Sequence, residues 1–369
     1  MQFFTLSIAF FASSIYNVCI TIHRKEVYAM FKKITGSWFE FTHHNIPEGK
    51  YLNPVCRHFS DEQWEAKIAE MAHIGMKYLV LTCSALAYED KAEIYFDSDI
   101  YPAPVDFACK NPMEVMFCAA DKYDMKIFVS VGFYGPWTHS YENMTSETVK
   151  ETAFGAMKRM YELFGKHPSF LYPIDQPPYI AVEAKPAFLW NYPDETCIDG
   201  HYDENFIKYC NAYSAHSHEI DPRLKTLIAP YGTCILKADD HFVDQLKRLD
   251  VDIVAYQDEI GVRKATTEQT GGFFKALREA HDKAGRSALW ADMELFEFEG
   301  DVYHSALIPA AIERLEKQIE AISPYVDEIL TYEYIGIMNE PGTIAYAGHP
   351  DSVDYYRQYE KLLKAKGVR

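Results

Sequence analysis

The sequence is poor in positive charge. It holds 36 Lys and Arg residues against 54 Asp and Glu residues, which gives a formal net charge of −18 at pH 7. Nucleic acids and anionic membrane surfaces are bound through basic side chains that neutralise phosphate. The charge balance therefore argues against both partners and suits a neutral or cationic substrate.

The eight cysteines form no recognisable metal or redox motif. The sequence has no C-x-x-C pair and no Cys/His cluster with zinc-finger spacing. Several cysteines, such as Cys83 and Cys118, lie within apolar strand or helix patterns. This placement predicts buried free thiols rather than a disulfide framework.

Two common enzyme motifs are also missing. No G-x-G-x-x-G turn follows the first predicted strand, which argues against an open dinucleotide-binding sheet. No G-x-S-x-G elbow occurs either, so a serine hydrolase of that type is not indicated. We expect no cofactor.

Residues 1–30 are expected to lie outside the folded domain. Their apolar run, residues 3–20, resembles a secretory signal but has no basic residue before it, and it is short and polar for a membrane span. A periplasmic or secreted protein follows if this segment is a signal. A cytoplasmic protein follows if translation starts at Met30. The sequence gives no indication of the oligomeric state.

Residues 31–369 read as one domain in which strands and helices alternate. Eight apolar, strand-like runs are each followed by a helical pattern, and most are continuous enough for a parallel sheet buried on both faces. Such a pattern predicts a single (β/α)8 TIM barrel. The expected strands are 34–41, 76–83, 125–133, a strand within 167–179, 225–231, 251–256, one starting at 287, and 328–334.

Acidic and aromatic residues gather where these strands end. The segment Ser287–Glu299 begins as a buried strand and ends in four carboxylates. In a TIM barrel, catalytic residues lie at the carboxyl ends of the strands. The catalytic candidates are Glu294, Asp258 and Asp175. The substrate-binding candidates are Trp38, Glu40, Tyr134, Trp137, Gln176, Tyr231, Gln257, Glu259, Trp290 and Glu333.

Carboxylates that meet at one barrel mouth are typical of glycosidases. Two suffice, one as acid/base and one as nucleophile or water activator, and Trp and Tyr rings can stack on sugars. The sequence therefore predicts a glycoside hydrolase with a carbohydrate substrate. The simpler reading of each acid, a solvated loop residue or a turn former, stays open at this stage.

Two further motifs carry less weight. His43-His44 raises a metal-dependent hydrolase, but the usual His-x-His spacing is absent and strands five and six end without histidine. We therefore predict no metal ligand. Asn339-Glu340-Pro341 matches an acid/base signature of some retaining glycosidases, but only 28 residues follow Pro341, so it is expected in the loop after strand eight.

Four segments together resemble the DUF4434 family. They are Gly36–Glu40, Phe170–Tyr179, Ala255–Val262 and Leu289–Glu297, within a resemblance spanning roughly 34–366. Members are barrel proteins, many from gut Bacteroidetes, labelled as glycoside hydrolases and sometimes as α-L-fucosidases. The family pattern Trp-Ala-x-x-Glu picks out Glu294. Our hypothesis is that Glu294 is the nucleophile or base, with Asp258 or Asp175 as its acid partner. Glu40 and Gln257 would then bind sugar hydroxyls.

One position departs from the family pattern. Members commonly carry a second acid after strand four, where this chain reads Asp175-Gln176-Pro177. Loss of that acid keeps a second hypothesis open, a carbohydrate-binding barrel without turnover.

Overall fold

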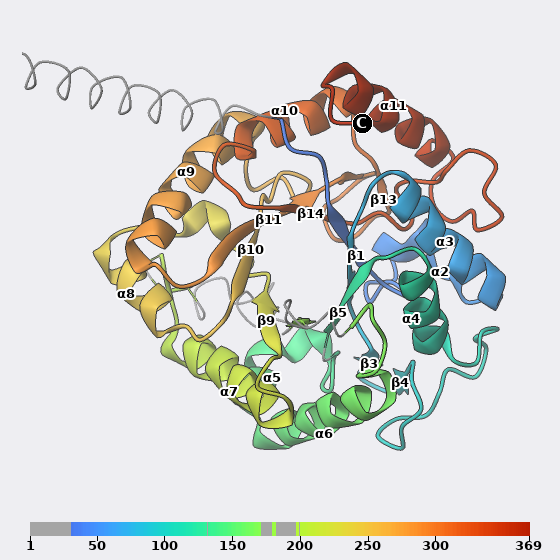
Figure 1. The fold of residues 1–369 in the computed structure, drawn as a ribbon, viewed down its shortest axis with the longest axis horizontal. Coiled ribbons are helices and arrows are strands. Elements are labelled where there is room, and N and C mark those ends of the chain that lie inside the picture. The colour runs from blue at the N-terminus through green and yellow to red at the C-terminus, as the bar shows by residue number, and fades with distance from the viewer. Residues whose placement is uncertain (1–30, 131, 171–178, 182–196, 199) are drawn as a thin grey trace, which may run out of the picture.

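The computed structural model describes residues 31–130, 132–170, 179–181, 197–198 and 200–369. Eight strands close into a barrel in the order β1-β14-β11-β10-β9-β6-β5-β2, and neighbouring strands pair in parallel. Figure 1 shows the helices forming a ring outside these strands. The predicted TIM barrel is therefore confirmed. The barrel strands are β1 Gly36–Phe39, β2 Tyr78–Leu81, β5 Lys126–Ser130, β6 Tyr179–Ala181, β9 Lys225–Ile228, β10 Ile253–Gln257, β11 Ala288–Glu294 and β14 Ile329–Tyr332.

The outer ring consists of helices whose ends follow from local sequence signals. Ser60 caps the first long helix, and its capping box with Gln63 is formed as the sequence indicates. Gly285 ends another helix in the left-handed conformation. Among the described residues, no helix is long and apolar enough to cross a membrane. The main helices are α3 Asp61–His73, α4 Pro112–Lys122, α6 Glu147–Phe164, α7 Glu204–Ile220, α8 Asp240–Arg248, α9 Thr267–Ala284, α10 Ile312–Ile322 and α11 Ser352–Ala365.

The strands separate two hydrophobic cores. The larger core lies between the strands and the helices and includes Phe39, Leu81 and Met293. The smaller core fills the barrel interior with Trp38, Val80, Phe128, Leu227, Ala229, Ile253, Ala255, Trp290 and Leu330. Because side chains alternate along a strand, membership of the smaller core shows which positions of each strand point inward.

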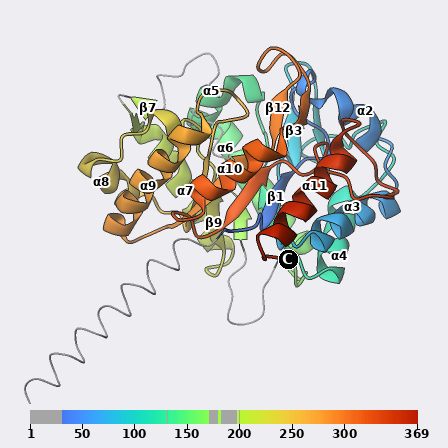
Figure 2. The same ribbon diagram turned by 90° about the horizontal axis from the view of Figure 1, so that it is seen from above.

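Additional short elements follow the carboxyl ends of the barrel strands. Figure 2 shows β3, β7, β12, α2 and α5 at one end of the barrel. These excursions surround the mouth where the sequence places the acidic residues. They include the hairpins β3 Ala85–Ala87 with β4 Ala92–Ile94, β7 Cys197–Ile198 with β8 His201–Tyr202, and β12 Phe296–Phe298 with β13 Leu307–Pro309, together with η1 Glu48–Tyr51, α2 Asn53–Cys56, η2 Trp137–His139, α5 Ser140–Thr145 and η4 Thr233–Ile235.

The fourth barrel strand is β6, Tyr179–Ala181, and residues 171–178 of the predicted segment 167–179 lie outside the described residues. One local expectation differs from the structure. Cys118 is exposed rather than buried, because it lies on the solvent side of α4, while Cys83 is buried as predicted. Residues 1–30 lie outside the described part of the chain.

Candidate active site

The inward-facing residues at the ends of β11 and β14 place acids and a tyrosine above the barrel core. Trp290 belongs to that core, so Asp292 and Glu294, which follow at alternate positions, face the same way. Tyr332 packs against the same core and is the register partner of Glu294. Asp292 is the register partner of Gln257, which is partly exposed. The mouth is therefore open to solvent at the level of Gln257.

Asp258 positions Glu294 rather than sharing the mouth with it. It follows the inward-facing Gln257, so its side chain reaches the outer layer, where Gln318 of α10 donates to Oδ2 at 2.6 Å. Its Oδ1 accepts from the backbone N–H of Glu294 at 3.1 Å. Arg314 of α10 donates to the Glu294 carbonyl at 2.8 Å. The end of β11 is thus fixed from the helix layer, and Asp258 is not placed as the acid partner that the sequence suggested.

Burial raises the pKa of the Glu294 carboxyl and of the Asp258 carboxyl. Glu294 is only 3% exposed, and its Oε2 accepts from the Val262 N–H at 2.9 Å. Burial first, and then the charge of Asp258, hold the pKa of Glu294 well above its usual range. Burial also raises the pKa of Asp258 to about 6, against the opposing hydrogen bond from Gln318. The raised pKa favours the protonated Glu294 carboxyl at pH values where an exposed glutamate would be ionised.

Glu259 has a structural role that the sequence did not reveal. It is fully buried with φ at +56°, and its carboxylate accepts from the N–H groups of Gly232 at 2.7 Å and Cys234 at 2.8 Å. These donors belong to the turn after β9. Glu259 therefore fixes the β9 loop to the end of β10, and substrate binding by its carboxylate would break these bonds.

Glu40 lies in a hydrogen-bonded cluster with two histidines and Tyr332. The Tyr332 hydroxyl donates to Glu40 Oε1 at 2.8 Å and lies 3.0 Å from His43 Nε2. His44 contributes its backbone N–H at 3.3 Å and its ring Nδ1 at 3.2 Å from the Glu40 carboxylate. The rings of His43 and His44 stack with centroids 4.6 Å apart. Glu40, His43 and His44 are all buried, and together they could hold a metal ion.

Two further tyrosines border this mouth. The hydroxyls of Tyr231 and Tyr303 are hydrogen-bonded to each other, and Lys264 Nζ lies 4.2 Å from the Tyr231 ring centroid. Burial raises the pKa of Tyr303, and the nearby carboxylates Glu294 and Glu259 raise it further. The sequence identified Tyr231 but missed Tyr303 and Tyr332. Tyr332 was detectable from strand alternation, whereas Tyr303 comes from the loop after β12.

The remaining candidates fall into three groups. Trp38 and Trp290 pack within the barrel core at 4% and 6% exposure, so a sugar cannot stack on them without entering that core. Tyr134 is buried and its ring stacks on Tyr101. Glu333 is buried and lines a small pocket with His43 and Glu48.

Three predicted residues are not placed by side chain. Asp175 and Gln176 lie outside the described residues. Trp137 belongs to the short helix η2, but its side chain is not described. Their roles stay predictions.

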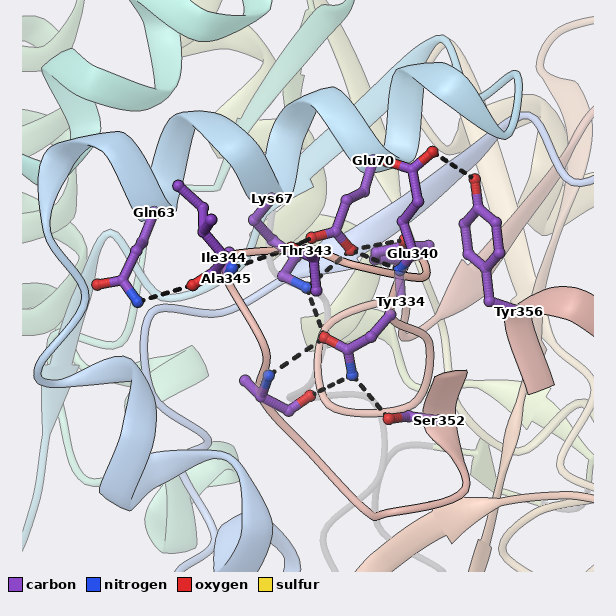
Figure 3. Close-up of polar contacts among 12 residues, drawn as sticks. Gln63, Lys67, Glu70, Tyr334, Glu340, Thr343, Ile344, Ala345, Ser352 and Tyr356 are labelled. Carbon is purple, nitrogen blue, oxygen red and sulfur yellow. Dashed lines mark hydrogen bonds and ion pairs between the residues drawn. The ribbon is translucent and has the colours of Figure 1, made fainter. Parts of the chain in front are cut away.

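The Asn339-Glu340-Pro341 motif lies in the loop after β14. Figure 3 shows Glu340 of this loop beside Glu70 and Lys67 of helix α3. Asn339 is fully buried, and its Oδ1 accepts from Lys67 Nζ at 2.8 Å. Lys67 also donates to Glu70 Oε2 at 2.9 Å, and the backbone N–H of Glu340 donates to the same oxygen at 3.0 Å. The motif is therefore part of a structural ion-pair cluster.

The closed barrel with acids at its mouth defines a TIM-barrel protein of the kind that hosts enzymes at this face. A family model, the domain of unknown function DUF4434, matches residues 34–345. The chain belongs to this family, as its sequence motifs predict. A comparison with curated protein sequences found no match.

Several solved structures share the fold at low identity. One is a "putative alpha-L-fucosidase" from Bacteroides thetaiotaomicron VPI-5482, with 16% identity, a TM-score of 0.63, and coverage of 92% of this chain and 94% of that one. Another is the endo-1,4-β-D-mannanase of Thermotoga petrophila RKU-1, with 10% identity, a TM-score of 0.56, and coverage of 89% and 99%. The GH99 endo-α-mannosidase of Bacteroides thetaiotaomicron has 12% identity, a TM-score of 0.50, and coverage of 91% and 98%. These likenesses establish the barrel fold.

Proposed function

We propose that the protein is a glycoside hydrolase in which Glu294 supplies the proton for the leaving group. The observation that carries the proposal is a buried, inward-facing carboxyl at the end of β11 whose pKa is raised by burial and by Asp258. A carboxylic acid that stays protonated near neutral pH can donate to a glycosidic oxygen as its C–O bond breaks. This favours the acid role over the nucleophile or base role inferred from sequence.

The second carboxylate of the proposed pair is Asp292. It faces inward one pleat below Glu294, beside the partly exposed Gln257. Asp258 has both carboxylate oxygens bound by Gln318 and backbone N–H groups, so it serves as a positioning residue. Asp175 stays a sequence-based alternative for the second carboxylate.

Sugar binding is assigned to the polar groups around these acids. Gln257, Tyr231 and Tyr303 would contact sugar hydroxyls or ring faces. The net charge of −18 suits a neutral or amino sugar better than an anionic one. The fold shared with a fucosidase-like protein and two mannoside-cleaving enzymes supports a glycosidase. The α-L-fucosidase activity belongs to the proposal as one substrate to test.

The test is hydrolysis of aryl glycosides, including α-L-fucosides and α- and β-mannosides, by the wild type and by Glu294→Gln. With an alkoxide-like leaving group, we expect Glu294→Gln to lose about 10²–10⁴-fold in kcat. The loss should be much smaller with dinitrophenyl glycosides, because such a leaving group departs without a proton. Asp292→Asn should be impaired with both kinds of leaving group.

The matched control is Glu297→Gln, the same substitution on the partly exposed middle residue of β12. It should keep wild-type rates. If Glu294→Gln reduced kcat equally with both kinds of leaving group, Glu294 would not be the acid. Sugar binding by calorimetry without turnover of any glycoside would instead support the carbohydrate-binding barrel.

A further inference from the structure

We propose that Glu40, His43 and His44 bind one divalent transition-metal ion, Zn²⁺ or a close neighbour in chemistry, at the barrel mouth. This site goes beyond the glycosidase proposal, which uses Glu294 and Asp292. It also revises the sequence-based expectation of no metal ligand. The sequence argument looked for His-x-His spacing, but here the carboxylate comes from the end of β1 and both imidazoles come from the loop that follows it.

The geometry of the three side chains fits coordination. One carboxylate oxygen and one ring nitrogen from each histidine lie within 4.8 Å of one another. Of these atoms, Glu40 Oε1 and His44 Nδ1 are 3.2 Å apart. Zinc bonds of about 2.0–2.2 Å place neighbouring tetrahedral ligands roughly 3.3–3.5 Å apart. Small side-chain shifts would therefore bring these atoms around one ion.

The charge of the surroundings favours a cation. Glu40, Glu48 and Glu333 are three acids next to His43, and the last two line a pocket with it. A bound metal ion would add positive charge beside these carboxylates.

The surroundings of His43 also allow the tautomer that a metal requires. The Asn45 carbonyl lies 3.1 Å from His43 Nδ1, so a protonated Nδ1 could donate to it and free Nε2 for the ion. Metal-binding histidines usually make such a bond with their second nitrogen. The Tyr332 hydroxyl bridges Glu40 Oε1 and His43 Nε2, the two atoms that an ion would join.

The donor set indicates the class of metal. Two imidazoles with one carboxylate suit Zn²⁺ and the later first-row divalent ions, whereas Ca²⁺ and Mg²⁺ prefer all-oxygen sites. A metal here would lie beside Tyr332, the register partner of Glu294. It could therefore bind hydroxyl groups of a substrate held at the same mouth.

The experiment measures metal binding by the full chain without any sugar. Purified protein is stripped with chelator, titrated with Zn²⁺, Co²⁺ and Mg²⁺, and followed by calorimetry, elemental analysis and melting. We expect about one Zn²⁺ per chain and a Tm rise of roughly 5 °C at a hundredfold excess over Kd. Co²⁺ should give visible ligand-field absorption, and Mg²⁺ should bind far more weakly.

His44→Gln should weaken Zn²⁺ binding at least tenfold and cut the Tm rise at the same Zn²⁺ concentration to about half or less. Glu40→Gln provides a second variant if His44→Gln fails to fold. The matched control is His73→Gln, because His73 also contacts a carboxylate, Glu340 at 2.9 Å, but on the exposed surface. It should bind Zn²⁺ like the wild type. No binding by the wild type, or equal binding by His44→Gln, would overturn the proposal. Neither outcome depends on glycosidase activity.

Discussion

Two buried polar clusters in this protein differ in the groups that pair with their acids. Lys67, Glu70 and Asn339 join α3 to the loop after β14, and the Lys67 ammonium is bound by both partners (Figure 3). At the mouth, Glu40 and Glu48 are grouped instead with two histidines and Tyr332. The first cluster supplies its own cation. The second concentrates acids where a ligand can enter, which distinguishes a structural cluster from a candidate functional one.

The largest loss of stability is expected when the cation of the first cluster is removed. Lys67→Met leaves the buried Glu70 carboxylate without its ammonium partner. We expect the free energy of unfolding to fall by about 3–5 kcal/mol, measured by urea denaturation.

The matched change at the mouth is Glu40→Gln in chelator-treated protein. It removes hydrogen bonds of a carboxylate but also removes buried negative charge, so the loss should stay below about 2 kcal/mol. Equal losses in Lys67→Met and Glu40→Gln would show that the two clusters do not differ as argued.

A third buried polar group, Asp258, should make the stability of the protein depend on pH in the acid range. Its pKa of about 6 in the folded protein lies above the ordinary value of 3.8 for an aspartate. The folded state therefore holds more protons between about pH 4 and 6, and the free energy of unfolding should fall as pH rises through that window. The expected change is roughly 2–3 kcal/mol.

Urea unfolding at several pH values, compared between the wild type and Asp258→Asn, measures this contribution together with the effect of the Asp258 charge on the pKa of Glu294. The variant should show a flatter dependence, and Glu297→Gln should follow the wild type. An unchanged slope in Asp258→Asn would mean that burial does not hold this proton.

The smallest effect is expected at the exposed edge of the first cluster. Glu340 is 32% exposed and contacts His73, so Glu340→Gln should change stability by no more than about 0.5 kcal/mol. Turnover of any substrate found should be unchanged, because this residue lies outside the mouth. A large loss of turnover would restore the catalytic reading of Asn339-Glu340-Pro341.

The barrel could be predicted from the sequence because the signals for its strands and helices lie within short segments. Apolar runs such as 76–83, the Ser60 cap and the Gly285 helix end each encode an element directly. The inward direction of Asp292 and Glu294 also followed from strand alternation. The same alternation, applied to Gln257 and Asp258, would have assigned Asp258 to the outer layer.

Other roles depended on contacts between distant segments. The Glu259 carboxylate accepts hydrogen bonds from the N–H groups of Gly232 and Cys234, about 25 residues earlier in the chain. Glu40 meets Tyr332 from the opposite end of the barrel sequence. No spacing rule within one segment encodes these pairs. The sequence could therefore identify acids at strand ends, but it could not show which of them make structural contacts and which are available to a ligand.

Hydrogen bonds from α10 fix the end of β11, so substitutions in the outer helix ring can affect the mouth. Arg314 and Gln318 bind the Glu294 carbonyl, and Gln318 also binds Asp258, although both residues belong to the outer helix ring. A change of side-chain length on that helix would tilt the strand end that carries Glu294 without altering any group that faces a sugar. Substitutions in α10 could therefore change the pKa and the position of the Glu294 carboxyl while the residues of the mouth stay the same.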